Sequence, residues 1–454
     1  MSSVPQGSLL GPVLFNAFVG DVDSGIEGTL SKFAHDTKQS GAVNMLDGRD
    51  TIQRDMARPK MWAGVNLIKF NKAMWTVGLR APSASVCVAG YGQSGGNEIL
   101  QLLPPPSLQV KETQGLCPER DFKVECGGFS NRPVYSLKYV PDTSESCSVC
   151  LGGQPTGKPK LLLDNLNPRL FPELTVTSGP PDSSLQVWQV SAEDSDVIKS
   201  VGAISTENAT GQPWAKIATI SARAPWVLHG SRLDSVQITE VESRKNVYMA
   251  ASRNSEELSG LAFLDCNTLL LCCAKGQLCL ADVRQPQSPL EAASVPSAPC
   301  GERWCMGVGR GPQGSDSISR PVARLSSGGH LTLTDLRKTS ESLASAKCRV
   351  PSSSSGAEFL CVSWAPVLES CLAVSGFDGT VHVYDAQSWD SSGGEAEPVF
   401  VHKGHAFGGW DGSGGPPLVT AHTWHPQKPR TLLSAASDGS LHVWDWVQSC
   451  GNCG

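Results

Sequence analysis

Three residue types that form hydrolytic triads occur in the carboxy-terminal part of the chain, as His405, Ser434 and Asp438. A serine nucleophile stands on a sharp turn that exposes its hydroxyl group, as in a Gly-x-Ser-x-Gly elbow. Ser434 lies instead inside the apolar run RTLLSAAS, and a second apolar run follows. The set therefore falls between strands and lacks a nucleophile turn, so we interpret it as structural rather than catalytic.

Two Cys-x-x-Cys pairs are the next candidates for chemistry: Cys147 with Cys150, and Cys450 with Cys453. Zinc takes four ligands, and two such pairs can supply two ligands each. The pairs lie far apart in the sequence, so we expect separate thiols, no metal site and no cofactor. A P-loop, a dinucleotide fingerprint and a metalloprotease motif are also absent from the sequence, which predicts a protein that is not an enzyme.

Bulk composition disfavours several functional classes. The 454 residues carry a net charge of −6, and charged residues form no long run of one sign, which disfavours binding to nucleic acid or anionic membranes. No stretch approaches the ~18 apolar residues of a membrane span, and the apolar segment 9–19 has no preceding Lys or Arg, so we expect neither a membrane anchor nor a signal peptide. Most of the 16 cysteines sit singly in apolar runs, which fits a reduced, intracellular protein.

A repeated hairpin pattern organises most of the chain. GFDGTVHVYD (376–385) and SDGSLHVWDW (437–446) carry the dipeptides Asp378–Gly379 and Asp438–Gly439 sixty residues apart. Asp-Gly between two apolar runs predicts a tight hairpin, because both residues tolerate a positive φ. The strand that follows has no plainly polar face, which indicates packing between two layers. Weaker copies give seven units in all and lie at 85–103, 178–190, 227–241, 270–284 and 323–337.

These motifs resemble those of the WD-repeat family. The resemblance implies an all-β, seven-bladed WD-repeat β-propeller over residues 74–447, with an inserted loop at 144–172 and a tail at 448–454. It also implies a structural hydrogen-bonded tetrad, formed by His405, Ser434, Asp438 and Trp444. Blade turns are expected at Asp182, Asp378, Gly379 and Gly439. Alternation of Trp75, Val77 and Leu79 predicts a strand that could close the ring.

Several strings, among them VAGYGQSGGNEILQL, GERWC and HTWHPQKPRTLLSAASDGSLHVWDW, are similar to one branch of this family, whose members assist assembly of the Integrator complex. The resemblance implies a nonenzymatic scaffold whose partners are proteins, in particular the Integrator RNA endonuclease heterodimer. It also implies links to the spindle pole, microtubule organisation and cell-cycle progression, with spindle-pole or microtubule proteins as further partners. We expect a cytoplasmic protein that also reaches the cytoskeleton and the nucleus, without direct contact to nucleic acid or membrane.

Two Asp-x-Arg endings support a different partner. Asp282–Arg284 and Asp335–Arg337 resemble the motif by which some propellers dock onto cullin-RING ubiquitin ligases, although Ala281 and Thr334 replace the tryptophan that precedes it. The alternative function is thus a substrate receptor of such a ligase, and a structural turn pair is the other interpretation.

Phe407 and Trp410 lie in the long Gly- and Ser-rich segment 387–417. Aromatic residues in such a loop can anchor a protein partner, because aromatic side chains supply much of the binding energy of interfaces. Packing over a blade edge is the alternative interpretation.

Residues 1–73 do not fit a propeller. VPQGSLLGPVLFNAFVGDVDSGI and LSKFAHDTKQSGA are similar to the palm region of reverse transcriptases from LINE-type retrotransposons. In those enzymes a FADD hairpin presents adjacent aspartates that hold two metal ions, whereas the pair here reads His35–Asp36. We expect an inactive remnant that forms a short irregular or helical extension, and a residual RNA-directed DNA polymerase fragment is the remote alternative.

Overall fold

The computed structural model describes residues 29–33, 36–40, 66–69, 74–79, 86–91, 97–105, 122–140, 173–190, 197–205, 213–221, 224–286, 290–292, 301–310, 320–337, 342–351, 357–407 and 416–446. These residues form 31 β-strands and three 3-10 helices, without an α-helix. Across the same ranges, no helix has the length and hydropathy required to cross a membrane.

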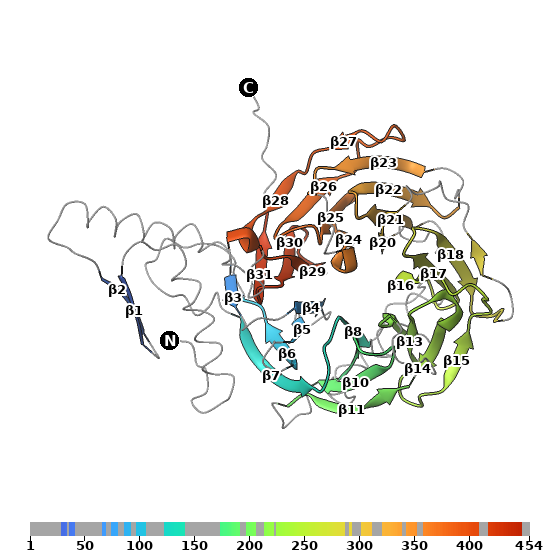
Figure 1. The fold of residues 1–454 in the computed structure, drawn as a ribbon, viewed down its shortest axis with the longest axis horizontal. Coiled ribbons are helices and arrows are strands. Elements are labelled where there is room, and N and C mark those ends of the chain that lie inside the picture. The colour runs from blue at the N-terminus through green and yellow to red at the C-terminus, as the bar shows by residue number, and fades with distance from the viewer. Residues whose placement is uncertain are drawn as a thin grey trace, which may run out of the picture.

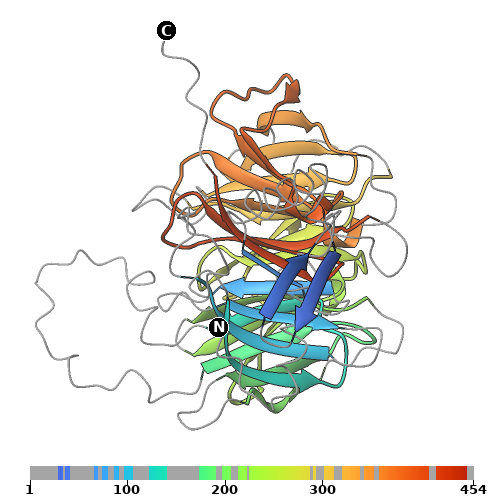
Figure 2. The same ribbon diagram turned by 90° about the vertical axis from the view of Figure 1, so that its left-hand side faces the viewer.

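Seven sheets, antiparallel apart from one short added strand, form a closed ring around a central axis (Figure 1), and Figure 2 shows the ring from its side. We call the region along this axis, between the innermost strands, the channel. We number the sheets as blades 1 to 7 in chain order. The innermost strands are β4 (Met74–Leu79), β8 (Ser136–Val140), β12 (Lys216–Ser221), β16 (Leu258–Phe263), β20 (Trp304–Val308), β24 (Cys361–Trp364) and β29 (Val419–Trp424). The second strands are β5 (Val86–Tyr91), β9 (Glu173–Ser178), β13 (Pro225–Gly230), β17 (Thr268–Cys273), β21 (Pro321–Ser326), β25 (Cys371–Ser375) and β30 (Thr431–Ala436).

Two further strands complete each blade. The third strands are β6 (Asn97–Leu103), β10 (Leu185–Val190), β14 (Gln237–Glu240), β18 (Leu278–Asp282), β22 (His330–Asp335), β26 (Val381–Asp385) and β31 (Ser440–Asp445). The outermost strands are β7 (Lys123–Ser130), β11 (Lys199–Ile204), β15 (Asn246–Met249), β19 (Glu291–Ala292), β23 (Ser342–Cys348), β28 (Phe400–His402) and, for blade 7, β3 (Asn66–Lys69). This architecture confirms the predicted seven-bladed propeller.

Each of the seven predicted units falls within the hairpin of second strand, turn and third strand of a different blade. The unit at 85–103 spans β5 and β6 of blade 1, and the unit at 437–446 contains the turn before β31 and that strand itself. The turn residues and the two-sided apolar pattern therefore mark the same hairpin in every blade, because each hairpin is enclosed by the two neighbouring sheets.

The hydrophobic core is divided among the seven contacts between consecutive blades. Seven clusters of buried side chains occur in the described residues, one at each contact. At the contact between blades 7 and 1, for example, Leu433 and Leu441 pack with Val88 and Leu100. A single blade could not bury both of its faces, so the ring is the unit that folds.

The strand that closes the ring comes from a part of the sequence that we assigned to the amino-terminal remnant. β3 pairs antiparallel with β31, from Asn66 opposite Val443 to Lys69 opposite Ser440. The strand predicted from Trp75, Val77 and Leu79 is present as β4, but it is the innermost strand of blade 1 and pairs with β5. The two ends of the propeller thus meet within blade 7, which leaves β31 without an open edge.

The described residues of the amino-terminal extension are strands, so the prediction of an irregular or helical extension is wrong for them. β1 (Thr29–Phe33) and β2 (Asp36–Ser40) form a two-stranded antiparallel sheet of their own. Asp36 begins β2, whereas His35 lies outside the described residues. The likeness of residues 1–73 to a reverse transcriptase stays a prediction.

Two segments depart from the regular four-stranded blade. The insert at 144–172 lies outside the described residues, but β8 and β9, the strands it connects, are paired neighbours in blade 2. In blade 5, β27 (Glu395–Ala396) adds a fifth strand parallel to β23, although it belongs to the segment between the third and fourth strands of blade 6. That segment therefore links the two blades, because it leaves blade 6 and adds a strand to the sheet of blade 5.

All seven innermost strands run in the same direction along the channel, because every blade repeats the same meander. The loops that lead into them consequently open on one side of the ring, together with the turns between second and third strands. We call this side the inlet face. It includes the 3-10 helices η2 (Leu233–Ser235), η4 (Ala357–Phe359) and η5 (Gly404–Phe407).

Candidate functional site

The predicted tetrad residues lie in blade 7 and in the loop that leads to it. His405 belongs to η5, Ser434 to β30 and Trp444 to β31. Trp444 Nε1 donates a hydrogen bond to Ser434 Oγ at 3.1 Å, and Ser434 Oγ lies 2.8 Å from His405 Nε2. Asp438 joins through Ser440, whose hydroxyl lies 2.6 Å from His405 Nδ1 and donates to Asp438 Oδ1 at 2.6 Å.

This series of hydrogen bonds is satisfied throughout by one protonation state. Ser440 donates its hydroxyl proton to the Asp438 carboxylate, so it accepts from His405 Nδ1–H. In the neutral imidazole Nε2 is then an acceptor, and Ser434 donates to it while accepting from the Trp444 indole. Burial, with a smaller effect of His402, holds the pKa of His405 well below its usual value. Because His405 and Ser434 are completely buried, the network ties a loop to a turn and does not present a nucleophile to a substrate.

His402 and His442 extend the network. Their facing nitrogens, His402 Nε2 and His442 Nδ1, lie 3.0 Å apart, and the His402 ring stacks on Trp444 with a centroid distance of 4.5 Å. Burial lowers the pKa of His402 to about 3. A side chain at Gly404 would collide with this pair, because its Cβ would come within 2.7 Å of both nitrogens.

A metal ion is the other chemistry that three clustered histidines could support. The candidate ligand nitrogens of His402, His405 and His442 lie within 4.8 Å of one another. However, the His405 and His442 rings stack in parallel, with centroids 3.7 Å apart and 4° between the planes, so their in-plane lone pairs cannot converge on one ion. Both His405 nitrogens also bind hydroxyl groups, and the cluster therefore fits a hydrogen-bond network better than a metal site.

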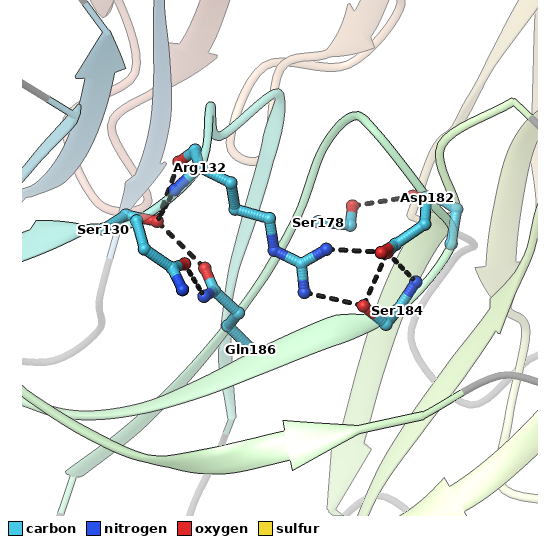
Figure 3. Close-up of polar contacts among 8 residues, drawn as sticks. Ser130, Arg132, Ser178, Asp182, Ser184 and Gln186 are labelled. Atoms are coloured by element: carbon cyan, nitrogen blue, oxygen red, sulfur yellow. Dashed lines mark hydrogen bonds and ion pairs between the residues drawn. The ribbon is translucent and has the colours of Figure 1, made fainter. Parts of the chain in front are cut away.

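Asp182 holds the corresponding turn of blade 2 (Figure 3). Its Oδ1 accepts hydrogen bonds from the Ser184 amide at 2.8 Å, the Ser184 hydroxyl at 2.6 Å and Arg132 Nη1 at 2.7 Å. Partial burial raises the pKa of Asp182, but the hydrogen bonds from Ser184 and Arg132 outweigh it and the pKa is lowered. Arg132 precedes β8, so this ion pair joins the inlet loop of blade 2 to its turn.

Asp378 and Asp438 repeat the same turn geometry. Asp378 Oδ1 accepts from the Thr380 amide at 2.8 Å and from the Thr380 hydroxyl at 2.5 Å, as Asp438 does from Ser440. An aspartate that binds the residue two positions later forms an Asx turn, which fixes the hairpin without a regular backbone turn. The recurring signal is therefore Asp-x-Ser/Thr.

The two predicted turn glycines serve different purposes. Gly439 has a φ of 86°, a left-handed conformation that favours glycine. In the other turn Gly376 supplies the positive φ, at 97°. Gly379 is required instead by close approach, since a Cβ there would lie 3.0 Å from the Pro417 carbonyl oxygen and 3.1 Å from the Ala406 nitrogen.

The predicted partner loop is only partly described. Phe407 ends η5, and Trp410 lies outside the described residues, as do all four cysteines of the Cys-x-x-Cys pairs. The partner-contact hypothesis for Phe407 and Trp410 therefore stays a prediction.

Both Asp-x-Arg endings are turn pairs in the structure. Arg284 Nη2 donates to Asp282 Oδ2 at 2.6 Å, and Arg337 Nη2 donates to Asp335 Oδ2 at 2.5 Å. Each arginine also bonds its aspartate through Nε, so both guanidinium groups are engaged within their own turns.

Aromatic side chains from three blades meet at the inlet end of the channel. The Tyr135 ring packs edge-on against Trp214 at a centroid distance of 5.7 Å, and it lies 6.1 Å from the Phe359 ring. Tyr135 leads into blade 2 and Phe359 into blade 6, two blades separated on the shorter side of the ring by blades 7 and 1. The contact therefore crosses the channel. All three rings are half-buried and form a platform at its centre.

Charged side chains surround this platform. Lys216 Nζ lies 3.2 Å from the centroid of the Trp214 ring, a cation–π contact. Arg303 donates to both carboxylate oxygens of Glu257, at 2.5 Å and 3.3 Å. Desolvation, reinforced by the charge of Arg303, lowers the pKa of Lys216 to about 7, although Glu257 and Glu358 oppose this shift. We call Tyr135, Trp214, Lys216, Glu257, Arg303 and Phe359 the channel mouth.

Comparison with known proteins assigns the chain to a family. It is 47% identical to the human "Integrator complex assembly factor WDR73" over 371 residues, which cover 80% of this chain and 89% of that protein. The chain belongs to the WDR73 family. The mouse and Xenopus laevis WDR73 proteins are 46% and 42% identical over 362 residues each, again with 80% of this chain and 89% of each relative covered. No protein-family model matches the chain.

Sequence reasoning missed two parts of the site in this WDR73 family member. Ser440 links His405 to Asp438, and its position two residues after the turn aspartate could have identified it. The channel mouth had only a weak signal, the position of Tyr135, Trp214 and Arg303 immediately before apolar strands. Their convergence depends on ring closure, which brings distant loops to one axis.

Proposed function

We propose that this chain is an assembly factor of the Integrator complex that acts by binding proteins and catalyses no reaction. The observation that carries the proposal is the identity of 42–47% to three vertebrate proteins of that name, over 80% of the chain.

Two features of the described residues support a scaffold. Seven interlocked blades make a rigid ring that presents loops on two faces and strands along its rim, which provides several recognition surfaces at once. In the residue set that most resembles a hydrolytic site, His405 and Ser434 are buried, and both are joined to Asp438 through structural hydrogen bonds. We further propose that the partner is the RNA endonuclease heterodimer of the complex.

Affinity purification tests this proposal. The tagged full-length chain, expressed in cells and recovered from cytosol, is expected to bring down the two endonuclease subunits, measured by quantitative mass spectrometry against an unrelated seven-bladed WD-repeat protein with the same tag. Recovery of Integrator subunits at the level of that control would contradict the proposal. A cullin adaptor that is recovered, and then lost on Arg284→Ala or Arg337→Ala, would favour the ubiquitin-ligase alternative.

The expected location is proposed along with the partner. We propose that the chain meets its partner in the cytoplasm, and its links to the spindle pole and microtubules stay predictions. Imaging of the tagged full-length chain through the cell cycle distinguishes diffuse cytoplasmic signal from signal at spindle poles.

A further inference from the structure

We propose that the channel mouth binds one aspartate or glutamate side chain, carried on an extended segment of a protein partner. This inference rests on the proposed function. It names the surface that would bind the protein partner and the type of side chain that this surface would recognise. The inference rests on contacts among side chains from blades 2 to 6.

The first argument is a desolvated cation that lacks a carboxylate. Lys216 is half-buried, and its ammonium group faces the Trp214 ring. Among the described residues, no carboxylate oxygen lies within 4.0 Å of Lys216 Nζ; Glu257 and Glu358 act on it only from a distance. Charged groups removed from water are normally paired, so this lysine has an unused capacity for an anion.

The second argument concerns the kind of anion. Both terminal nitrogens of Arg303 already bind Glu257. Arg232, whose charge also acts on Glu257, donates from Nη1 to the Ser255 carbonyl. The mouth therefore offers the ammonium group of Lys216, and the Arg303 guanidinium group is not available to bind a phosphate through two nitrogens. Glu257 and Glu358 would also repel a dianion more strongly than a single carboxylate.

The third argument concerns the neighbours of the acidic residue. Tyr135, Trp214 and Phe359 are half-buried and keep part of their surface exposed, so a segment that crosses the mouth would pack apolar side chains on these rings. A second lysine, Lys138 on β8, lies beneath the mouth with part of its side chain exposed; desolvation lowers its pKa, and Cys361 of β24 opposes that shift. An acidic residue between apolar neighbours matches both features.

Such binding would be coupled to proton uptake. Desolvation lowers the pKa of Lys216 to about 7 in the free protein, and a carboxylate close to its ammonium group would raise it again. Only the protonated lysine attracts the carboxylate. The affinity is therefore expected to fall as pH rises above 7, by up to about tenfold per pH unit.

Nuclear magnetic resonance of the full chain with ¹³C-methylated lysines tests the assignment directly. The probe is a capped peptide of sequence GLELG, compared with GLQLG and with the peptide that carries phosphoserine in the central position. We expect GLELG to shift the Lys216 resonance and raise its titration midpoint by about one pH unit or more, and GLQLG to leave both unchanged. No shift with GLELG up to about 5 mM, or a stronger response to the phosphopeptide, would overturn the proposal.

A second measurement separates this inference from the proposed function. Lys216→Met is expected to weaken capture of the endonuclease subunits about 10- to 100-fold, the effect of losing a hydrogen bond to a charged group. Lys216→Arg, which keeps the charge, should retain most of the capture and reports on folding. Lys275→Met is the matched control, because Lys275 lies on the same face with a side chain that is 83% exposed.

The outcomes are distinct. Undiminished capture by a folded Lys216→Met variant would overturn the inference and leave the proposed function intact. Absence of capture by the unaltered chain would contradict the proposed function, and the peptide titration would still decide the chemistry of the channel mouth.

Discussion

Ser434 contacts two side chains directly and is connected to two more through His405. It accepts from the Trp444 indole and contacts His405, which in turn binds Ser440 and through it Asp438. All of these except Asp438 are almost completely buried, so a lost hydrogen bond there cannot be replaced by water.

Ser434→Ala is expected to lower the free energy of unfolding by about 2–4 kcal/mol, because it leaves both the indole N–H and His405 Nε2 without a partner. Chemical denaturation followed by tryptophan fluorescence measures the change. Ser388→Ala is the matched control, since Ser388 is exposed, and it should alter stability by less than about 0.5 kcal/mol. Equal stability of the two variants would show that the network contributes nothing.

At the scale of elements, the closure of the ring depends on one short strand. β3 supplies the outermost strand of blade 7, whereas all other strands of that blade come from the opposite end of the chain. Without β3, β31 becomes an open edge whose backbone groups can pair with a second molecule.

Two deletions test this closure. Removal of residues 1–65 keeps β3 and should leave a monomer with nearly unchanged stability. Removal of residues 1–70 also deletes β3 and should lower the free energy of unfolding by about 2–4 kcal/mol, through lost backbone hydrogen bonds across four residue pairs. It should also increase oligomer formation, which light scattering after size-exclusion chromatography detects. Identical behaviour of the two forms would show that the ring closes without β3.

At the scale of the whole molecule, several histidines from different blades are buried in the neutral state. Burial lowers the pKa of His402 to about 3 and those of His229 and His422 to about 4, and it holds the pKa of His405 well below its usual value. In the unfolded chain these groups titrate near 6.5, so the unfolded state takes up protons first as the pH falls.

The stability contributed by these neutral histidines is therefore complete above pH 6.5 and is lost as the pH falls toward 4. Each histidine contributes a slope of up to about 1.4 kcal/mol per pH unit. Denaturation curves at several pH values between 7.5 and 4 are expected to show a steep decrease below 6.5. His229→Asn should reduce that slope by about one proton, and a flat profile between pH 6.5 and 4.5 would contradict the assignment.

The sequence by itself determined the fold class and the number of blades. Turn aspartates and glycines act locally, and the two-sided apolar pattern reports burial between sheets, so all seven hairpins could be found without coordinates. Contacts such as Trp444 with Ser434 follow from the same hairpin: Trp444 pairs with Leu432 and His442 with Ser434, so Trp444 and Ser434 are diagonal neighbours on one face of adjacent strands.

Only the tertiary structure decided how the ring closes and what lies at its centre. β3 pairs with a strand more than 350 residues later, and no local pattern specifies that partner. The channel mouth likewise brings Tyr135 into contact with Phe359 across the ring. Charged residues of three other blades also shift the pKa of Lys216. Such properties depend on distances through space between loops, and those distances exist only after seven blades have closed into one ring.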